Sequence, residues 1–118
     1  RHDNSIEKAD KVLLKNDRVI EISAKSIDAK QNDETGELLG LLKLSSNGSQ
    51  TLVKHYEKLE NSHIGPFHDA ESFQRAKFVD ILQELVLSGI EITPIPIQGN
   101  WCEIDTFDDL DRARKKFF

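Results

Sequence analysis

Two carboxylates near the C-terminal end of the chain, Glu103 and Asp105, have the types and the spacing expected of a metal site. If the run from Trp101 to Asp105 is a strand, both side chains point to the same face of it. Carboxylates on one face repel each other unless a cation or a proton lies between them. A hard divalent ion such as Mg²⁺ takes oxygen ligands and keeps positions open for phosphate oxygens. The same spacing is compatible with two solvated surface acids beside a helix cap.

A short strand from Trp101 to Ile104 and a helix directly after it would position these acids. Thr106 and Asp109 match a capping box, and Asp108 and Asp109 stand in the first turn, where negative charge is favourable. The apolar positions of this helix share one face, which we expect to pack on a core: Phe107, Leu110, Ala113 and Phe117.

The first third of the chain indicates a hairpin followed by a further strand. Two β-type runs, Val12 to Leu14 and Val19 to Ile22, flank Asn16-Asp17, and both turn residues tolerate left-handed geometry. The polar stretch from Asp28 to Glu37 predicts an exposed loop. The apolar stretch from Leu38 to Leu44 predicts a buried strand.

The middle of the chain predicts two helices and one more strand. Leu52, Tyr56 and Leu59 lie on one face of a helix after the capping residues of Ser46 to Ser49. A second helix is expected from Asp69 to Ser88, ending before Gly89.

The second helix has two distinct faces in this prediction. Its apolar face is expected to be Phe78, Ile81, Leu82 and Leu85, and its polar face Asp80, Gln83 and Glu84. Ile90 to Ile97 then predicts a strand, which Pro94 and Pro96 would restrict to an edge or a bulge. The order of elements indicates a mixed α/β fold.

Composition narrows the class of protein. The 118 residues suit one modest domain, and a net charge of −5 without a basic patch argues against nucleic-acid binding. No apolar run approaches the roughly 20 residues of a membrane span. Cys102 is the only cysteine, which excludes an internal disulfide and a cysteine-rich zinc site and favours a reducing, cytoplasmic setting.

The run from Gly99 to Leu110 resembles the signature W-x-E-I-D-T-x-x-D-L near the end of many nucleotidyltransferases, especially choline-phosphate and phosphonate cytidylyltransferase-like enzymes. Two upstream blocks, from Ala9 to Ile22 and from Gly36 to Ser45, resemble the same family in the same order. The resemblance covers nearly the whole chain. It implies the C-terminal half of a glycosyltransferase-A-like, mixed-sheet α/β fold, with residues 1–118 forming part of one nucleotidyltransferase domain.

The resemblance also implies a reaction and roles for individual residues. A phosphate or phosphonate oxygen of a small acceptor would attack the α-phosphorus of CTP or another nucleoside triphosphate and release pyrophosphate. Asp105 would be a Mg²⁺ ligand and Glu103 its neighbour in or near the coordination sphere. Lys25 would touch the acceptor phosphate and Glu37 would face the acceptor, or both would be solvated surface groups. Trp101 would anchor the core beside the site or stack on a ligand.

The chain departs from the family pattern in one respect. No glycine-rich loop ending in arginine occurs, and the lysine and aspartate of the nucleotide-binding half are also missing. We therefore expect the chain alone to be inactive and its parent to be the enzyme. The alternatives are a non-catalytic binding or regulatory module and a clipped fragment. Because half a domain leaves a sheet edge and an apolar face uncovered, we also expect a homodimer.

Overall fold

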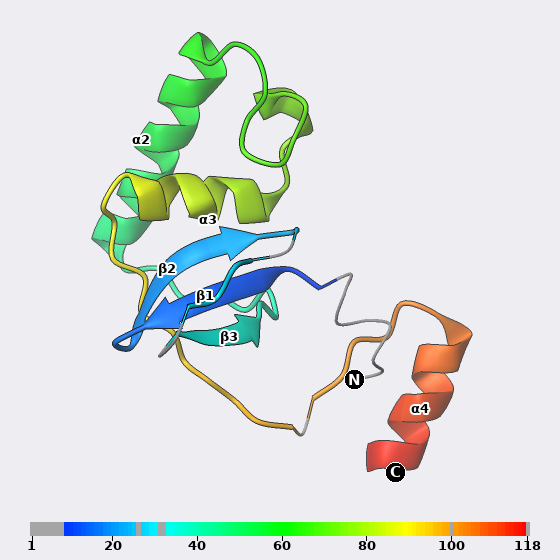
Figure 1. Ribbon diagram of the computed structural model, residues 1–118. Coiled ribbons are helices and arrows are strands. Elements are labelled where there is room, and N and C mark those ends of the chain that lie inside the picture. The colour runs from blue at the N-terminus through cyan, green and yellow to red at the C-terminus, as the bar shows by residue number, and fades with distance from the viewer. Residues whose placement is uncertain (1–8, 26, 31–32, 100, 118) are drawn as a thin grey trace.

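The predicted hairpin is confirmed by a computed structural model that describes residues 9–25, 27–30, 33–99 and 101–117 (Figure 1). Strands β1 (Lys11–Lys15) and β2 (Arg18–Ser23) pair antiparallel, with a bulge between Leu13 and Leu14. Asn16 and Asp17 connect them with φ of 52° and 60°. Positive φ at both central residues is what a tight two-residue hairpin turn requires.

A third strand, β3 (Glu34–Glu37), pairs antiparallel with β1 and gives the order β2-β1-β3. Two predictions are wrong here, because the polar stretch contains this strand and the apolar stretch from Leu38 to Leu44 forms none. An edge strand can be polar, since it pairs on one side only. Gly40 turns the chain with φ of 81°, and Leu41 is 83% exposed. The described sheet is antiparallel rather than mixed.

The two middle helices form, the second one later than predicted. Helix α2 (Ser46–Ser62) begins after Ser45, whose Oγ accepts the N–H of Gly48 at 2.9 Å. A short 3₁₀ helix, η1 (Phe73–Arg75), then precedes α3 (Phe78–Leu87). The prediction of helix from Asp69 onward is wrong, because 69–77 is occupied by a tight turn and η1. Gly89 ends α3 as predicted, with φ of 85°.

The core lies between α3 and the sheet, and α2 lies beyond α3 (Figure 1). Ile22 of β2 packs against Val79, Leu82 and Leu85 of α3. A second cluster, Phe67, Phe73 and Ile81, joins η1 and its preceding turn to the other side of α3. The α/β class is thus confirmed, with α3 as the element that holds the sheet.

The chain after residue 89 corrects both remaining strand predictions. Ile90 to Ile97 and Trp101 to Ile104 are irregular in the described residues. One backbone bond, from Val19 N–H to the carbonyl of Ile92 at 3.2 Å, holds the start of this segment beside β2. Pro94 and Pro96 lack the N–H groups that a longer ladder needs.

Helix α4 (Phe107–Phe117) follows and stands to one side of the sheet (Figure 1). Its predicted core face is formed only in part, because Ala113 is buried whereas Phe107 is 88% and Phe117 40% exposed. Within the described ranges, no helix has the length and apolar character that crossing a bilayer requires.

Candidate functional site

The carboxylates of Glu103 and Asp105 stand on an exposed, irregular segment directly before α4. Both residues are exposed to solvent. The strand that was predicted to align them is not formed. A pleated sheet therefore does not set their relative orientation in the described residues.

The capping box predicted at the start of α4 is confirmed. Asp109 N–H donates to Thr106 Oγ1 at 3.1 Å, and Asp109 Oδ2 accepts the N–H groups of Thr106 at 3.1 Å and of Asp105 at 3.0 Å. Arg112 pairs with the second oxygen of the same carboxylate. The N–H of Asp105 is the main reason that the pKa of Asp109 lies below its ordinary value, and Thr106 and Arg112 add to the effect. Asp109 thus holds the backbone of the candidate ligand Asp105.

The residues around this segment give the candidate metal site only part of a ligand set. Glu103 and Asp105 supply the oxygen donors that Mg²⁺ prefers. Among the described residues, no group of three or more His, Cys, Asp and Glu side chains could hold a metal ion. Trp101 is half-buried, and its carbonyl accepts the Lys116 ammonium at 3.4 Å. Trp101 therefore ties the segment to the last turn of α4.

Lys25 and Glu37, the two predicted acceptor-binding residues, lie at one end of the sheet. In the register, Lys11 of β1 stands opposite Ser23 of β2 on one side and Glu37 of β3 on the other. Lys25 follows Ser23 by two residues. Strand β2 runs toward the side of the molecule on which α4 lies (Figure 1). The fold thus places Lys25 and Glu37 at the same end of the sheet, with β1 between their strands, while Glu103 and Asp105 lie on the segment before α4.

Lys25 does not stand alone on the surface. Its Nζ lies 4.0 Å from Asp69 Oδ1, and its backbone N–H donates to Ser23 Oγ at 2.9 Å. The Ser23 hydroxyl in turn donates to Asp69 Oδ2 at 2.7 Å. These contacts link the exit of β2 to the turn before η1.

Asp80 extends this network into the core. It is only 4% exposed, although the sequence pattern placed it on the polar face of the helix. Its carboxylate accepts the N–H of Lys77 at 2.9 Å and the N–H of Asp69 at 3.4 Å. A buried carboxylate is tolerated when backbone donors surround it. Asp80 therefore starts α3 and holds the turn that carries Asp69.

Sequence reasoning missed Ser23, Asp69 and Asp80. Asp69 and Asp80 were assigned to one long helix, in which eleven residues would separate them by three turns. Their meeting depends on the turn between them, and the one available signal was Gly65-Pro66 just upstream, which marks a break without fixing where the helix resumes.

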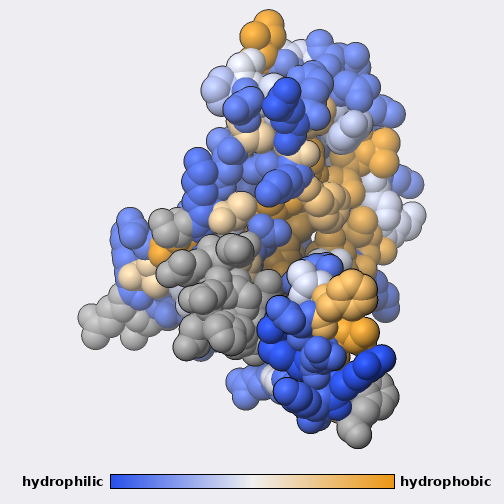
Figure 2. All heavy atoms as spheres, turned by 90° about the vertical axis from the view of Figure 1, so that its right-hand side faces the viewer, coloured by the Kyte–Doolittle hydropathy of each residue, from blue (hydrophilic) through white to orange (hydrophobic). Residues whose placement is uncertain are grey.

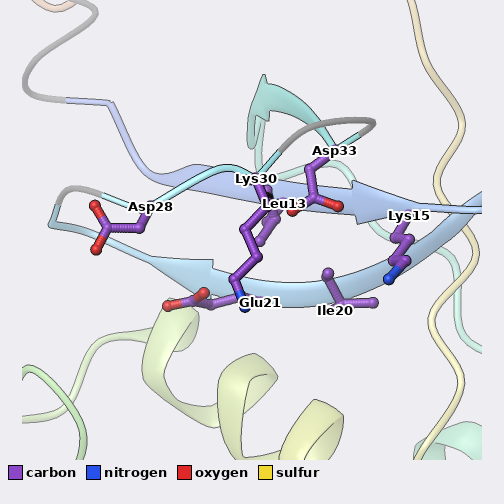
Figure 3. A pocket seen from close by; sticks show the side chains of 7 residues that line it. All are labelled: Leu13, Lys15, Ile20, Glu21, Asp28, Lys30 and Asp33. Carbon is purple, nitrogen blue, oxygen red and sulfur yellow. Dashed lines mark hydrogen bonds between the residues drawn. The ribbon is translucent and has the colours of Figure 1, made fainter.

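A shallow hollow of about 360 Å³ lies elsewhere, on the sheet face turned away from α3 (Figure 3). Leu13 and Ile20 line it together with Glu21 and with Lys30 from the loop after β2. Side chains of both charges surround a small apolar floor. None of the predicted site residues lines this hollow.

Comparison with known proteins gives one informative similarity. No protein-family model matches the chain, and no solved structure matches it. Among curated proteins, the chain is similar to the CTP:phosphoglutamine cytidylyltransferase of Campylobacter jejuni, with 30% identity over 112 residues. The similar region covers 94% of this chain and 42% of the relative, so the chain spans less than half of that relative's length. The similarity supports a relationship to cytidylyltransferase-like nucleotidyltransferases.

Proposed function

We propose that this chain is the acceptor- and metal-binding part of a nucleotidyltransferase that transfers CMP from CTP to a phosphorylated small molecule. The observation that carries the proposal is the similarity to a cytidylyltransferase over 94% of the chain. An oxygen of the acceptor phosphate attacks the α-phosphorus of CTP, a new P–O–P bond forms, and the bond to the β-phosphate breaks to release pyrophosphate. The nucleotide-gripping residues lie in the remaining part of the catalytic domain, which has the glycosyltransferase-A-like fold.

The proposed metal ligands are Asp105 and Glu103. Their carboxylate oxygens suit Mg²⁺, and oxygens of CTP or of a residue from the rest of the domain would supply the other ligands. Bound Mg²⁺ would neutralise charge that develops on the phosphate oxygens. Asp109 keeps the backbone N–H groups of residues 105 and 106 on one oxygen, which holds the Asp105 backbone against the first turn of α4.

The proposed acceptor site is the end of the sheet that carries Lys25 and Glu37. The Lys25 side chain is 71% exposed, so a phosphate that arrives from solvent can reach its ammonium. Phosphate recognition by a lysine rests on charge rather than on a fixed hydrogen-bonding fork. Glu37, half-buried across the sheet, would face the rest of the acceptor, and Trp101 would anchor the metal-bearing segment beside it.

We further propose a homodimer in a cytoplasmic setting. Large apolar side chains are exposed on the segment before α4 and at the start of the helix, among them Ile95, Ile97, Ile104 and Phe107. The face of the molecule that carries α4 shows hydrophobic groups beside a largely hydrophilic helix (Figure 2). Exposed apolar groups of this size are the kind of surface that a partner chain covers.

The proposed reaction is tested by pyrophosphate release from the full-length protein. The assay pairs each of the four ribonucleoside triphosphates with a panel of acceptors, namely phosphoglutamine, phosphocholine, a phosphonate and a sugar phosphate. We expect turnover with CTP that stops when Mg²⁺ is chelated. Absence of turnover with every pair would favour a non-catalytic binding module instead.

The role of Asp105 is tested by Asp105→Asn, with Asp108→Asn as the matched control on the same turn of chain. Loss of an outer partner of a metal ligand costs about 10- to 100-fold, so loss of the ligand itself should cost at least about a hundredfold in kcat/KM. Line broadening of the Glu103 and Asp105 signals by Mn²⁺ gives a second readout that needs no activity. Full activity in Asp105→Asn would remove this residue from the mechanism.

A further inference from the structure

The turn before η1, from Phe67 to Ala70, contains one residue in a sparsely populated backbone conformation. Phe67 and Ala70 exchange two backbone hydrogen bonds, of 3.0 and 2.9 Å, around His68 and Asp69. His68 has φ of 52°, a conformation that most residues other than glycine avoid. Strain of this kind persists only where the surroundings enforce it.

The surroundings of the turn are correspondingly firm. Phe67 is 2% exposed and its ring packs edge-on against Phe73 at 5.1 Å. His68 Nε2 lies 3.2 Å from Glu84 Oε1 of α3. Asp80 holds the backbone of Asp69 from the first turn of α3. Three contacts therefore fix the turn to the core, and the Asp69 carboxylate takes part in none of them.

That carboxylate faces the exit of β2. Oδ2 accepts the Ser23 hydroxyl at 2.7 Å, and Oδ1 lies 4.0 Å from Lys25 Nζ. The longer distance is an electrostatic attraction rather than a hydrogen bond. With its proton directed to Asp69, the Ser23 hydroxyl presents a lone pair to the N–H of Lys25. The Asp69 carboxylate thus acts on the Lys25 backbone through the Ser23 hydroxyl and on the Lys25 ammonium by charge attraction.

We propose that Asp69 is a positioning residue of the acceptor site, which holds Lys25 at the end of β2 so that its ammonium meets the acceptor phosphate. The inference rests on the proposed function, because it takes Lys25 as the acceptor-binding cation. It adds a chain of contacts in which Asp80 fixes the turn, the turn fixes Asp69, and Asp69 with Ser23 fixes Lys25. Asp69 itself touches neither substrate nor metal.

The test compares Asp69→Asn with Glu71→Gln in the full-length protein. Both changes remove one carboxylate charge from the same short segment, but Glu71 is 84% exposed and pairs only with Arg75 at 3.7 Å in the described residues. For Asp69→Asn we expect the KM for the acceptor to rise about five- to tenfold, because an exposed ion pair is lost and a charged hydrogen bond becomes a neutral one. The KM for CTP and kcat should stay within about twofold, and Glu71→Gln should change none of the three.

A second pair of variants separates positioning from a general structural role. Ser23→Ala should raise the acceptor KM as Asp69→Asn does, and Ser23→Thr, which keeps the hydroxyl, should restore it. A lower kcat and a higher KM for every substrate, together with a lower Tm, would show a merely structural role. A fall in acceptor KM in Asp69→Asn would show that Asp69 competes with the phosphate and would overturn the proposal.

A binding readout keeps this inference distinct from the proposed reaction. Inorganic phosphate is titrated into protein labelled at lysine Cε, with the Lys25 signal assigned through Lys25→Arg. We expect Lys25 to saturate at about five- to tenfold higher phosphate in Asp69→Asn than in the unaltered protein or in Glu71→Gln. Equal saturation in all three sinks the positioning role even if the enzyme is active. A shifted Lys25 curve without any pyrophosphate release sinks the reaction and leaves the positioning role standing.

Discussion

The sheet with α3 and the segment from residue 93 to the end of α4 hold their shapes by different forces. In the first region, buried apolar side chains of β2 and α3 interlock, and Asp80 and Gln83 satisfy backbone groups at the same junction. In the second, order comes from the capping box of Thr106 and Asp109, while Ile95 is 82% and Phe107 88% exposed. Capping orders only the first turn of α4, whereas side-chain packing holds β2 and α3 together.

The difference bears on the two candidate sites. Lys25 is positioned by contacts with Ser23 and Asp69, which belong to the packed region of the sheet and α3. Asp105 inherits its position from α4, which has 11 residues and is too short to be stable in water by helix propensity alone. The proposed acceptor site is therefore built into the fold of this chain, and the proposed metal ligands need added packing to be held in one place.

The largest expected contrast between the regions comes from truncating one apolar side chain in each. Leu82→Ala should lower the free energy of unfolding by about 2–5 kcal/mol, because the side chain is 3% exposed and its loss leaves a cavity. Phe107→Ala should change it by less than about 0.5 kcal/mol. Urea denaturation followed by circular dichroism measures both.

Leu87→Ala is the matched control, since Leu87 lies on the same helix as Leu82 and is 64% exposed. It should behave like Phe107→Ala. A cost for Phe107→Ala as large as that for Leu82→Ala would show that α4 is packed as firmly as α3, and the contrast between the two regions would disappear.

The same contrast explains which parts of the fold could be predicted from sequence. The hairpin turn at Asn16-Asp17, the stop at Gly89 and the box of Thr106 and Asp109 were predicted correctly, because each depends on residues within four positions of one another. Apolar runs gave wrong strand predictions where contacts with distant parts of the chain decide the structure. Leu38 to Leu44 has the composition of a buried strand, yet the polar β3 takes the place beside β1.

For the candidate site, the residues could be predicted from the sequence, but the structure that carries them could not. Residue types and spacing pointed to Glu103 and Asp105, and the resemblance pointed to Lys25 and Glu37, but the pattern could not say that the strand under the acids is absent. Asp80 was assigned to the polar face because the helical period places it opposite the apolar face of Phe78, Ile81, Leu82 and Leu85. Its burial follows from the later start of α3, which the tertiary contacts of Phe67 and Phe73 decide.

A smaller effect is expected from the apolar side chains that the second region exposes. If a second copy of this chain covers them, sedimentation should show a dimer that dissociates on dilution. Phe107→Ser should weaken the dimer by roughly tenfold or more, since burying one such side chain contributes about 1.5–3 kcal/mol. Asp111→Ser, on the exposed polar part of α4, should leave the association unchanged. A monomer at every concentration would contradict the proposed homodimer.

The smallest expected effect is a pH response confined to the first turn of α4. The pKa of Asp109 is lowered in the folded chain, mainly by the N–H of Asp105, so the bonds it accepts contribute fully above the ordinary value of 3.8. That contribution is lost as the pH falls through the lower folded-state pKa. The amide NMR signals of Asp105 and Thr106 should therefore shift with a midpoint below pH 3.8, before the signals of α3 change.

Asp109→Asn should abolish the shift, because an amide keeps an acceptor oxygen and does not titrate. A midpoint at or above 3.8 would mean that Asp109 does not hold the Asp105 backbone, and the start of α4 would then need another contact to place the candidate metal ligand.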